Sequence, residues 1–294
     1  MLDSCYQFLR KFKPTPVGSW SETFELAARW GLLPDRSLNP LTRNSRRYWS
    51  QSDEDGIIEK ILGRVAIEAE SRTFLELGVG DGSENNTLAL LASKWSGVWI
   101  GAENLRFTPC VGGRLVFKKD WISVENVAQL AKGGFSELGV PASPSIVSVD
   151  LDGNDFHVVK TLIDAGIHPS IWVVEYNARF PTSAEWVMPY NLQHTWDSRD
   201  DYFGASLLSW TNLFDSFGYF LVACSATGAN AFYVNNTFRE RFLDCPKAVE
   251  ELYQPPLYAT APVWAHKASA RTLRSLTAPL SDAVLYGRGT ASDG

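Results

Sequence analysis

The chain has 294 residues, 45% of them hydrophobic, which is enough for one large α/β domain with appendages or for two small domains. Its formal net charge of −6 offers no positive surface for a phosphate backbone and so argues against nucleic acid as a partner. The four cysteines are scattered, and no apolar run approaches the roughly 20 residues of a membrane span, so we expect a cytoplasmic protein without a membrane partner.

The first fifty residues differ from the rest, because four prolines divide them into short pieces around one helix-like run, Ser21–Trp30. We interpret residues 1–52 as a cap or lid over the main domain. At its end the polar stretch Ser50–Gly56 leads into a predicted helix, Asp53–Ala69. Gln51 is the residue of this stretch that we expect to contact a ligand.

From residue 53 onwards the spacing of apolar residues alternates between that of helices and that of strands. The predicted strands are Thr73–Val79, Gly97–Ala102, Arg114–Lys118, Ser145–Val149, Ser170–Glu175, Tyr219–Cys224 and Asn230–Val234. The predicted helices are Asp53–Ala69, Ser83–Trp95, Val124–Ala131, Phe156–Ala165 and Ser206–Phe217. The alternation predicts right-handed βαβ units, and thus an α/β fold whose mostly parallel sheet carries helices on both faces and ends in an antiparallel hairpin.

The same pattern divides the chain into three predicted parts. The cap is followed by a ligand-binding domain over residues 53–244. Within it, residues 178–205 interrupt the alternation and are interpreted as a lid or substrate loop, because long connections in compact domains often bind ligands. Residues 245–294 form a predicted C-terminal extension whose end, rich in small and polar residues, is expected to be flexible.

The most informative motif is a strand that runs into closely spaced glycines, FLELGVGDGS at Phe74–Ser83. Glycines let the backbone bend and admit a ligand without a Cβ in the way. A dinucleotide site favours G-x-G-x-x-G, but here Ser83 takes the last position. Glu76, two residues before Gly78, would repel a pyrophosphate and attract a cationic amino group. Glu103 ends the next strand, where a carboxylate can accept hydrogen bonds from ribose hydroxyls.

This pattern, E-x-G-x-G-x-G, with an acid after the second strand and a terminal hairpin, resembles the class I S-adenosylmethionine (SAM)-dependent methyltransferases over residues 53–235. The resemblance implies a Rossmann-like fold with a seven-stranded sheet, SAM as cofactor, and methyl transfer to a small-molecule acceptor, with O-methylation favoured. On it, the cofactor-binding residues would be Glu76, Gly78, Gly80, Asp81, Gly82, Glu103, Asn104, Asp120 and Trp121, with Gln51 from the cap. For Trp121, a place in the core is the alternative. The stretches Val147–Asp155 and Val173–Asn177 distantly resemble the FkbM-like branch.

Carboxylates follow two strands that should be neighbours in the sheet. Asp150, Asp152 and Asp155 come after one strand, and Glu175 and Asn177 end the next. Clustered carboxylates repel one another unless a cation or a shared proton intervenes. Oxygen ligands suit Mg²⁺ or Mn²⁺, as in catechol O-methyltransferase-like enzymes, which this layout resembles. We therefore predict a metal site of Asp150, Asp152, Glu175 and Asn177; the alternatives are turn and N-cap roles for Asp152 and Asp155, or acid/base use without a metal.

The catalytic residues that we expect are Asp150, Asp152 and His194. His194 lies between Tyr190 and Trp196 in the predicted lid, where it could act as a general base. Two rival functions stay open: a glycosyltransferase, whose D-x-D pair Asp150 and Asp152 would hold Mn²⁺ against a nucleotide-sugar diphosphate, and a non-catalytic SAM-fold scaffold for a partner protein. A homodimer also stays open.

Overall fold

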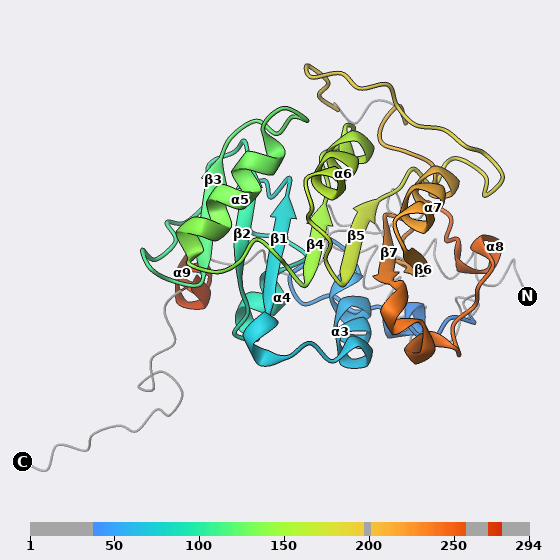
Figure 1. Ribbon diagram of the computed structural model, residues 1–294, viewed down its shortest axis with the longest axis horizontal. Coiled ribbons are helices and arrows are strands. Elements are labelled where there is room, and N and C mark those ends of the chain that lie inside the picture. Colours follow the sequence, from blue (N-terminus) through green and yellow to red (C-terminus); the bar gives the residue numbers. More distant parts are fainter. Residues whose placement is uncertain (1–37, 197–200, 257–269, 278–294) are drawn as a thin grey trace, which may run out of the picture.

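The computed structural model describes residues 38–196, 201–256 and 270–277, and the structural statements below concern these residues (Figure 1). Seven strands form one sheet in the order β3-β2-β1-β4-β5-β7-β6. The strands are β1 (Thr73–Leu77), β2 (Ser96–Gly101), β3 (Leu115–Lys119), β4 (Ile146–Val149), β5 (Ile171–Glu175), β6 (Tyr219–Cys224) and β7 (Asn230–Asn235). Strand β7 runs antiparallel to both β5 and β6, and the other neighbours pair in parallel. The predicted mostly parallel sheet with a C-terminal antiparallel hairpin is thus confirmed.

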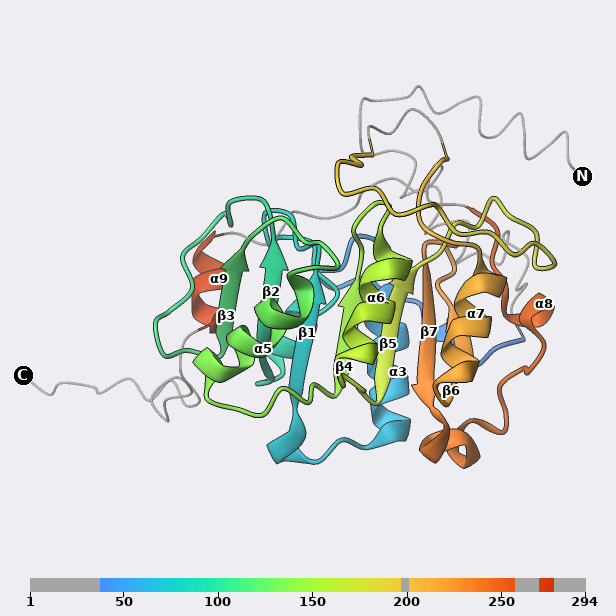
Figure 2. The ribbon, with the colours of Figure 1, turned by 45° about the horizontal axis from the view of Figure 1, so that its top comes forward.

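Helices cover both faces of this sheet, as predicted (Figures 1 and 2). The helices are α3 (Glu54–Val65), α4 (Leu88–Ala92), α5 (Val127–Leu138), α6 (Asp155–Asp164), α7 (Leu207–Ser216), α8 (Val249–Leu252) and α9 (Ala270–Thr277), with 3-10 turns η1 (Thr42–Asn44), η2 (Ala69–Ser71) and η3 (Asn236–Phe242). One hydrophobic cluster joins α5, α6 and α7 to the sheet, and a second joins α3 and α4 to its other face. The spacing of Val127, Ala131 and Phe135 shows why α5 packs there, because residues four positions apart share one helix face and all three are fully buried. The molecule is therefore an α/β, Rossmann-like fold.

The first helix after the glycines is shorter than predicted. The pattern suggested Ser83–Trp95, but α4 covers only Leu88–Ala92. In the preceding turn the amides of Asn86 and Thr87 donate to the side chain of Glu76 rather than to helical carbonyls. A buried side-chain acceptor thus competes with the helical hydrogen-bond pattern and delays the helix.

Helix α5 is longer than predicted, and the predicted end at Ala131 is wrong. The helix continues through two glycines to Leu138 and ends at Gly139, whose φ of +77° is the left-handed conformation of a helix C-terminus. A Cβ on Gly134 would lie 2.4 Å from Val98 Cγ1. This glycine therefore permits a close helix–sheet approach, which outweighs its poor helix propensity.

The described part of the predicted cap packs against the β6–β7 hairpin. The side-chain amide of Asn39, through Nδ2, donates a hydrogen bond to Val222 O at 2.6 Å. The Asp53 carboxylate accepts hydrogen bonds from Ala226 N at 2.7 Å and from Thr227 Oγ1 at 2.8 Å. This contact places the residues just before α3 beside the carboxyl ends of the strands.

The predicted domain limits at residues 52/53 and 244/245 remain predictions, and the helix-like run Ser21–Trp30 lies outside the described residues. Within the described ranges, no helix combines the length and the apolarity needed to cross a membrane.

Candidate functional site

The sheet changes direction between β1 and β4. From β1 the chain builds β2 and β3 on one side, and then returns to build β4 and β5 on the other. In open α/β sheets, ligands bind outside the carboxyl ends of the strands at such a switch point. The glycine turn follows β1, and Asp150 follows β4, so both predicted motifs lie at this place.

A cavity of about 320 Å³ opens at the switch point, within the range of about 300–1,000 Å³ found for small-molecule sites. Eight predicted site residues line it: Gln51, Glu76, Gly78, Gly80, Asp81, Glu103, Asp150 and Asp152. The other seven do not line it: Gly82, Asn104, Asp120, Trp121, Glu175, Asn177 and His194. The carboxylates that line it are Glu54, Glu76, Asp81, Glu84, Glu103, Asp150 and Asp152. None of the described residues that line it is basic, so every lining carboxylate that is ionised makes the potential in the cavity more negative.

The three glycines of the turn have different roles. Gly78 has a φ of +82°, and a Cβ there would lie 1.5 Å from Asp150 O, so no larger residue fits. Gly80 has a φ of +50°, and no atom lies within 4 Å of the position that a Cβ would take, which leaves its backbone open to the cavity. A Cβ on Gly82 would meet Leu105 and Trp99 at 2.9 and 3.0 Å, so Gly82 serves core packing rather than the cavity.

The carboxylate of Glu76 is hydrogen-bonded to other residues of the protein, and Glu76 also lines the cavity. Its carboxylate accepts hydrogen bonds from Asn86 N at 2.8 Å, from Thr87 N at 3.1 Å and from the Thr87 hydroxyl. Burial raises the pKa of Glu76 to about 7, although these hydrogen bonds act in the opposite direction. Glu76 therefore organises the turn, in addition to the ligand contact that the sequence predicts for it.

Glu54 and Asn230 are cavity residues that the sequence interpretation missed. Asn230 Nδ2 donates to Glu54 Oε1 at 3.0 Å, and Ser52 N donates to Glu54 Oε2 at 3.1 Å. Burial raises the pKa of Glu54, and the neighbouring Asp53 adds to the effect. Asn230 Oδ1 is buried with no hydrogen-bond partner among the described residues. Acids at the start of a helix such as α3 are expected simply because they interact favourably with the helix dipole, and no local signal joins them to a strand 176 positions away.

A group of three carboxylates, one of which is Asp150 of the cavity lining, lies at the ends of β4 and β5. Carboxylate oxygens of Asp150, Asp155 and Glu175 all lie within 4.8 Å of one another. Burial, followed by the neighbouring carboxylates, raises the pKa of Asp150 and Glu175 well above the ordinary range. Asp155 accepts from Leu151 N at 2.7 Å and from Gly153 N at 2.9 Å, which is the turn role considered as the alternative. Within the described residues, Glu175 Oε2 has no hydrogen-bond partner.

Asn177 and His194 are engaged elsewhere. The Asn177 amide donates to Asp201 O at 2.7 Å and to Phe203 O at 3.1 Å, so it holds the connection before α7. His194 Nε2 lies 3.1 Å from Asp152 O. Asp152 has a φ of +53°, which is uncommon outside glycine and is often found at ligand sites. Burial raises its pKa, and His194 partly offsets that effect. The structure thus joins His194 to the Asp152 turn rather than to the cavity itself.

Three of the predicted cofactor-binding residues, Asn104, Asp120 and Trp121, lie outside the cavity lining near the edge of the sheet formed by β3. Trp121 is 46% exposed and its Nε1 donates to Leu192 O at 3.1 Å, so the alternative that it belongs to the core is wrong. Asn104 Oδ1 accepts from Lys119 Nζ at 2.6 Å. Asp120 is exposed at the end of β3.

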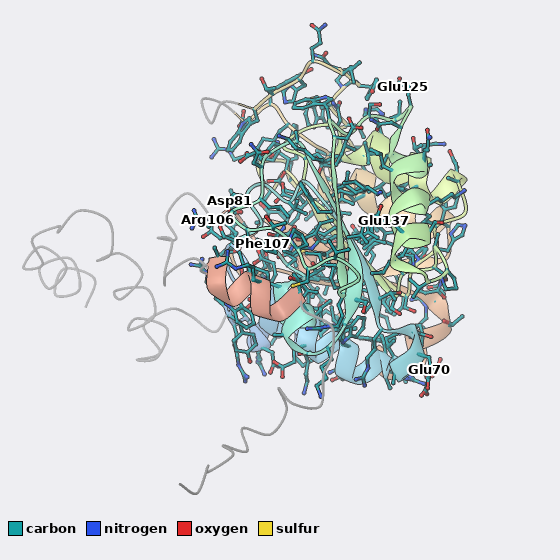
Figure 3. All side chains as sticks on the ribbon, turned by 90° about the vertical axis from the view of Figure 1, so that its left-hand side faces the viewer. Glu70, Asp81, Arg106, Phe107, Glu125 and Glu137 are labelled. Carbon is teal, nitrogen blue, oxygen red and sulfur yellow. The ribbon has the colours of Figure 1, made fainter. Side chains whose placement is uncertain are left out.

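Two arginines pair with acids at the mouth of the cavity. Arg106 lies 2.9 Å from Asp81, and Figure 3 shows the two side chains together just above α9. Arg47 lies 3.0 Å from Glu84 and joins the segment before α3 to the chain just after the glycine turn. These two pairs offset part of the negative charge of the lining.

Comparisons with known proteins add little to this geometry. No family model matches the chain, and no curated protein matches it. Among solved structures the chain is similar to the YjhP protein from E. coli, with 17% identity and a TM-score of 0.26 over 62% of this chain and 71% of that one. At that score the likeness supports no inference about function. The FkbM-like resemblance is not confirmed.

Proposed function

We propose that the protein is a SAM-dependent methyltransferase that binds its cofactor in the cavity at the β1–β4 switch point. The observation that carries this proposal is a glycine turn opening into a cavity with seven lining carboxylates and no basic lining residue among those described. Such a lining repels the diphosphate of a dinucleotide or a nucleotide sugar. It attracts the ammonium and sulfonium groups of SAM, which supplies the methyl group as a sulfonium.

Different lining residues would contact different parts of the cofactor. The open backbone of Gly80 admits the nucleoside, and Glu103 after β2 would accept hydrogen bonds from its ribose hydroxyls. Glu54 and Asn230 offer oxygens to the cofactor's ammonium group. Methyl transfer is an in-line displacement, so the protein must also align a small-molecule acceptor and remove one proton.

We propose an oxygen nucleophile as the acceptor, with Asp150 taking its proton. Without a bound cation, the raised pKa of Asp150 would make its ionised form a stronger base than an ordinary aspartate, and a cation bound to its carboxylate would take over the task of activating the acceptor. The group of Asp150, Asp155 and Glu175 also fits Mg²⁺ or Mn²⁺, because oxygens from all three lie within 4.8 Å of one another and Glu175 Oε2 has no partner in the described ranges. A cation held there would lower the pKa of the acceptor's hydroxyl. The proposed roles of Asp152 and His194 in catalysis stay predictions.

Titration calorimetry tests whether the protein binds SAM. We expect SAM and S-adenosylhomocysteine to bind with dissociation constants in the micromolar range, and NAD⁺ and uridine diphosphate with Mn²⁺ not to bind. Absence of heat with both sulfur nucleosides overturns the proposal, and tight binding of uridine diphosphate favours the glycosyltransferase instead. Transfer of a radiolabelled methyl group to a panel of hydroxylated small molecules then separates an enzyme from a non-catalytic scaffold.

Electron paramagnetic resonance of Mn²⁺ tests whether the protein binds a divalent metal ion at the proposed site. We expect the full chain to bind Mn²⁺ and Asp150→Asn to lose at least tenfold in affinity. The control is Asp164→Asn, which makes the same change in an exposed aspartate on α6. Equal binding by both variants, or no binding by the wild type, contradicts the metal site.

A further inference from the structure

A second and larger cavity, about 500 Å³, lies between α3 and α4 on the face of the sheet that these helices cover. It shares no lining residue with the candidate cofactor cavity. Three aromatic residues, Tyr48, Trp49 and Trp95, line it together with apolar side chains that include Ile58 and Leu62. The proposed function uses none of these residues.

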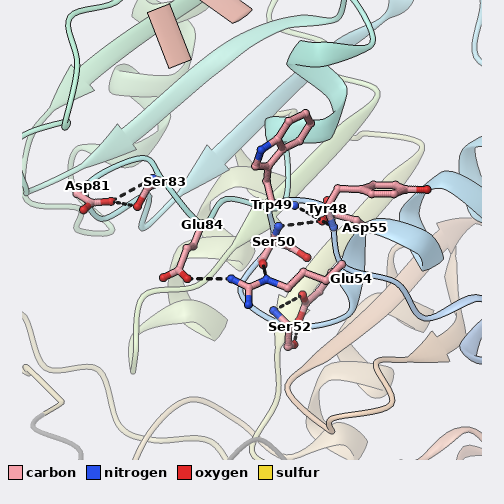
Figure 4. A network of polar contacts seen from close by, with 10 residues as sticks. Tyr48, Trp49, Ser50, Ser52, Glu54, Asp55, Asp81, Ser83 and Glu84 are labelled. Atoms are coloured by element: carbon pink, nitrogen blue, oxygen red, sulfur yellow. Dashed lines mark hydrogen bonds and ion pairs between the residues drawn. The ribbon is translucent and has the colours of Figure 1, made fainter. Parts of the chain in front are cut away.

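Asp55 gives this cavity a buried negative charge. The residue is 2% exposed, and its Oδ2 accepts hydrogen bonds from three successive amides, Tyr48 N and Trp49 N at 2.7 Å and Ser50 N at 2.8 Å (Figure 4). Its other oxygen, Oδ1, is buried and has no hydrogen-bond partner in the part of the chain that the structure describes. A buried carboxylate oxygen without a donor is unfavourable, so a donor supplied by a ligand would complete the site.

The other charged residues of the lining agree with a cationic ligand. Glu59 adds a second carboxylate, and the hydroxyl of Tyr48 donates to it at 3.1 Å. Arg72 is the one basic residue among the described residues of this lining, so the acids outnumber the bases. Aromatic rings attract organic cations through the negative faces of their π systems.

We propose that this cavity binds a small organic ammonium ion that carries alkyl or aryl groups. The aromatic and apolar lining receives the organic groups, and the carboxylates of Asp55 and Glu59 balance the charge. A neutral apolar molecule would leave Asp55 Oδ1 without a donor, and a hydrated metal ion would make no use of the aromatic lining.

Calorimetry on the full chain with two matched pairs of probes tests the site. Butylamine is compared with butan-1-ol, and benzylamine is compared with benzyl alcohol, because each ammonium ion combines N–H donors with a positive charge that its neutral counterpart lacks. At least one cation should bind ten times more tightly than its neutral counterpart, with affinity that falls as salt is added. The proposal is overturned if neither cation binds, or if the neutral molecules bind equally well.

The variant Asp55→Asn tests whether the carboxylate of Asp55 binds the cation. Its amide oxygen can still accept from the three amides that Oδ2 now holds, while an NH₂ group replaces Oδ1 and the negative charge is lost. We expect at least a tenfold loss of cation affinity with an unchanged circular dichroism spectrum, and no loss in Asp164→Asn on the other face of the sheet. Should Asp55→Asn fail to fold, Glu59→Gln at an exposed position should still lose at least threefold. Wild-type affinity in the folded variants rejects the site.

Discussion

Asn230 donates its side-chain amide to Glu54 Oε1 across 3.0 Å, and so joins β7 to the first turn of α3 beside the candidate cofactor cavity. We expect Asn230→Ala to lower the free energy of unfolding by about 1–2 kcal/mol, because a buried carboxylate loses a donor. The affinity for S-adenosylhomocysteine should fall about tenfold, since the hydrogen bond that lowers the pKa of Glu54 is also lost. Urea unfolding and calorimetry measure the two effects.

The control for this variant is another amide that donates to a glutamate. Asn212 Nδ2 donates to Glu185 Oε1 at 3.2 Å on the exposed surface. Asn212→Ala should change stability by less than about 0.5 kcal/mol and leave ligand affinity unchanged. If both variants bind S-adenosylhomocysteine like the wild type, Asn230 has no part in the site.

The sequence predictions include some of the residues that line this cavity and miss others. Glu76, Gly80 and Asp150 line it as expected, because the turn after a parallel strand is a local feature and the carboxyl ends of such strands meet at one edge. Glu54 and Asn230 come from elements that meet only in the folded chain, so no spacing in the sequence reveals them.

The same distinction explains the errors in the helices. Periodicity located five of the seven helices in the described residues and missed α8 and α9, and the ends of the helices depend on contacts that periodicity does not contain. The carboxylate of Glu76 accepts hydrogen bonds from the backbone amides of Asn86 and Thr87, which in a longer α4 would donate to helical carbonyls. Gly134 faces Val98 closely enough that a glycine inside α5 is required, although its propensity argued for an end.

The glycines of the turn allow a prediction that separates binding from folding. Gly80→Ala should fold, because nothing lies within 4 Å of the added Cβ, although a φ of +50° costs about 1 kcal/mol in a residue other than glycine. Its methyl group would occupy the cavity, so affinity for S-adenosylhomocysteine should fall at least tenfold. Gly78→Ala should fail to fold, because its Cβ would overlap Asp150 O. Soluble yield, circular dichroism and calorimetry distinguish the two, and unchanged affinity in Gly80→Ala would place the cofactor elsewhere.

Glu76 should make stability fall as the pH rises. Burial raises its pKa from 4.5 to about 7, so between these values the folded state binds a proton that the unfolded state has released. This contribution is fully present below pH 4.5 and is lost as the pH passes through 7, with a size of about 3 kcal/mol. Urea unfolding of the wild type and of Glu76→Gln at pH 5 and pH 8 measures it, because the variant does not titrate at this position.

The unfolding free energy of the wild type, measured relative to that of Glu76→Gln, should therefore fall by about 2.5 kcal/mol from pH 5 to pH 8, because part of the full contribution is already lost at pH 5. Glu137→Gln on α5, whose carboxylate pairs with Lys118 at the exposed surface, is the control and should give a constant difference (Figure 3). A difference that stays constant for Glu76→Gln shows that its carboxylate is ionised at both pH values.

Asp53 should stabilise the fold far more than an ordinary surface aspartate. Its carboxylate accepts from Ser45 Oγ at 2.6 Å, from Ala226 N at 2.7 Å and from Thr227 Oγ1 at 2.8 Å, and it thereby holds the chain before α3 against the hairpin. Removing it leaves several partly buried donors without acceptors, so Asp53→Ala should lower the free energy of unfolding by about 2–3 kcal/mol. Asp164→Ala, which breaks only an exposed pair, should cost about 0.5 kcal/mol or less. Because the held segment carries Glu54 into the cavity wall, Asp53→Ala should also weaken S-adenosylhomocysteine binding, and equal stability of the two variants would show that the hairpin is held by other contacts.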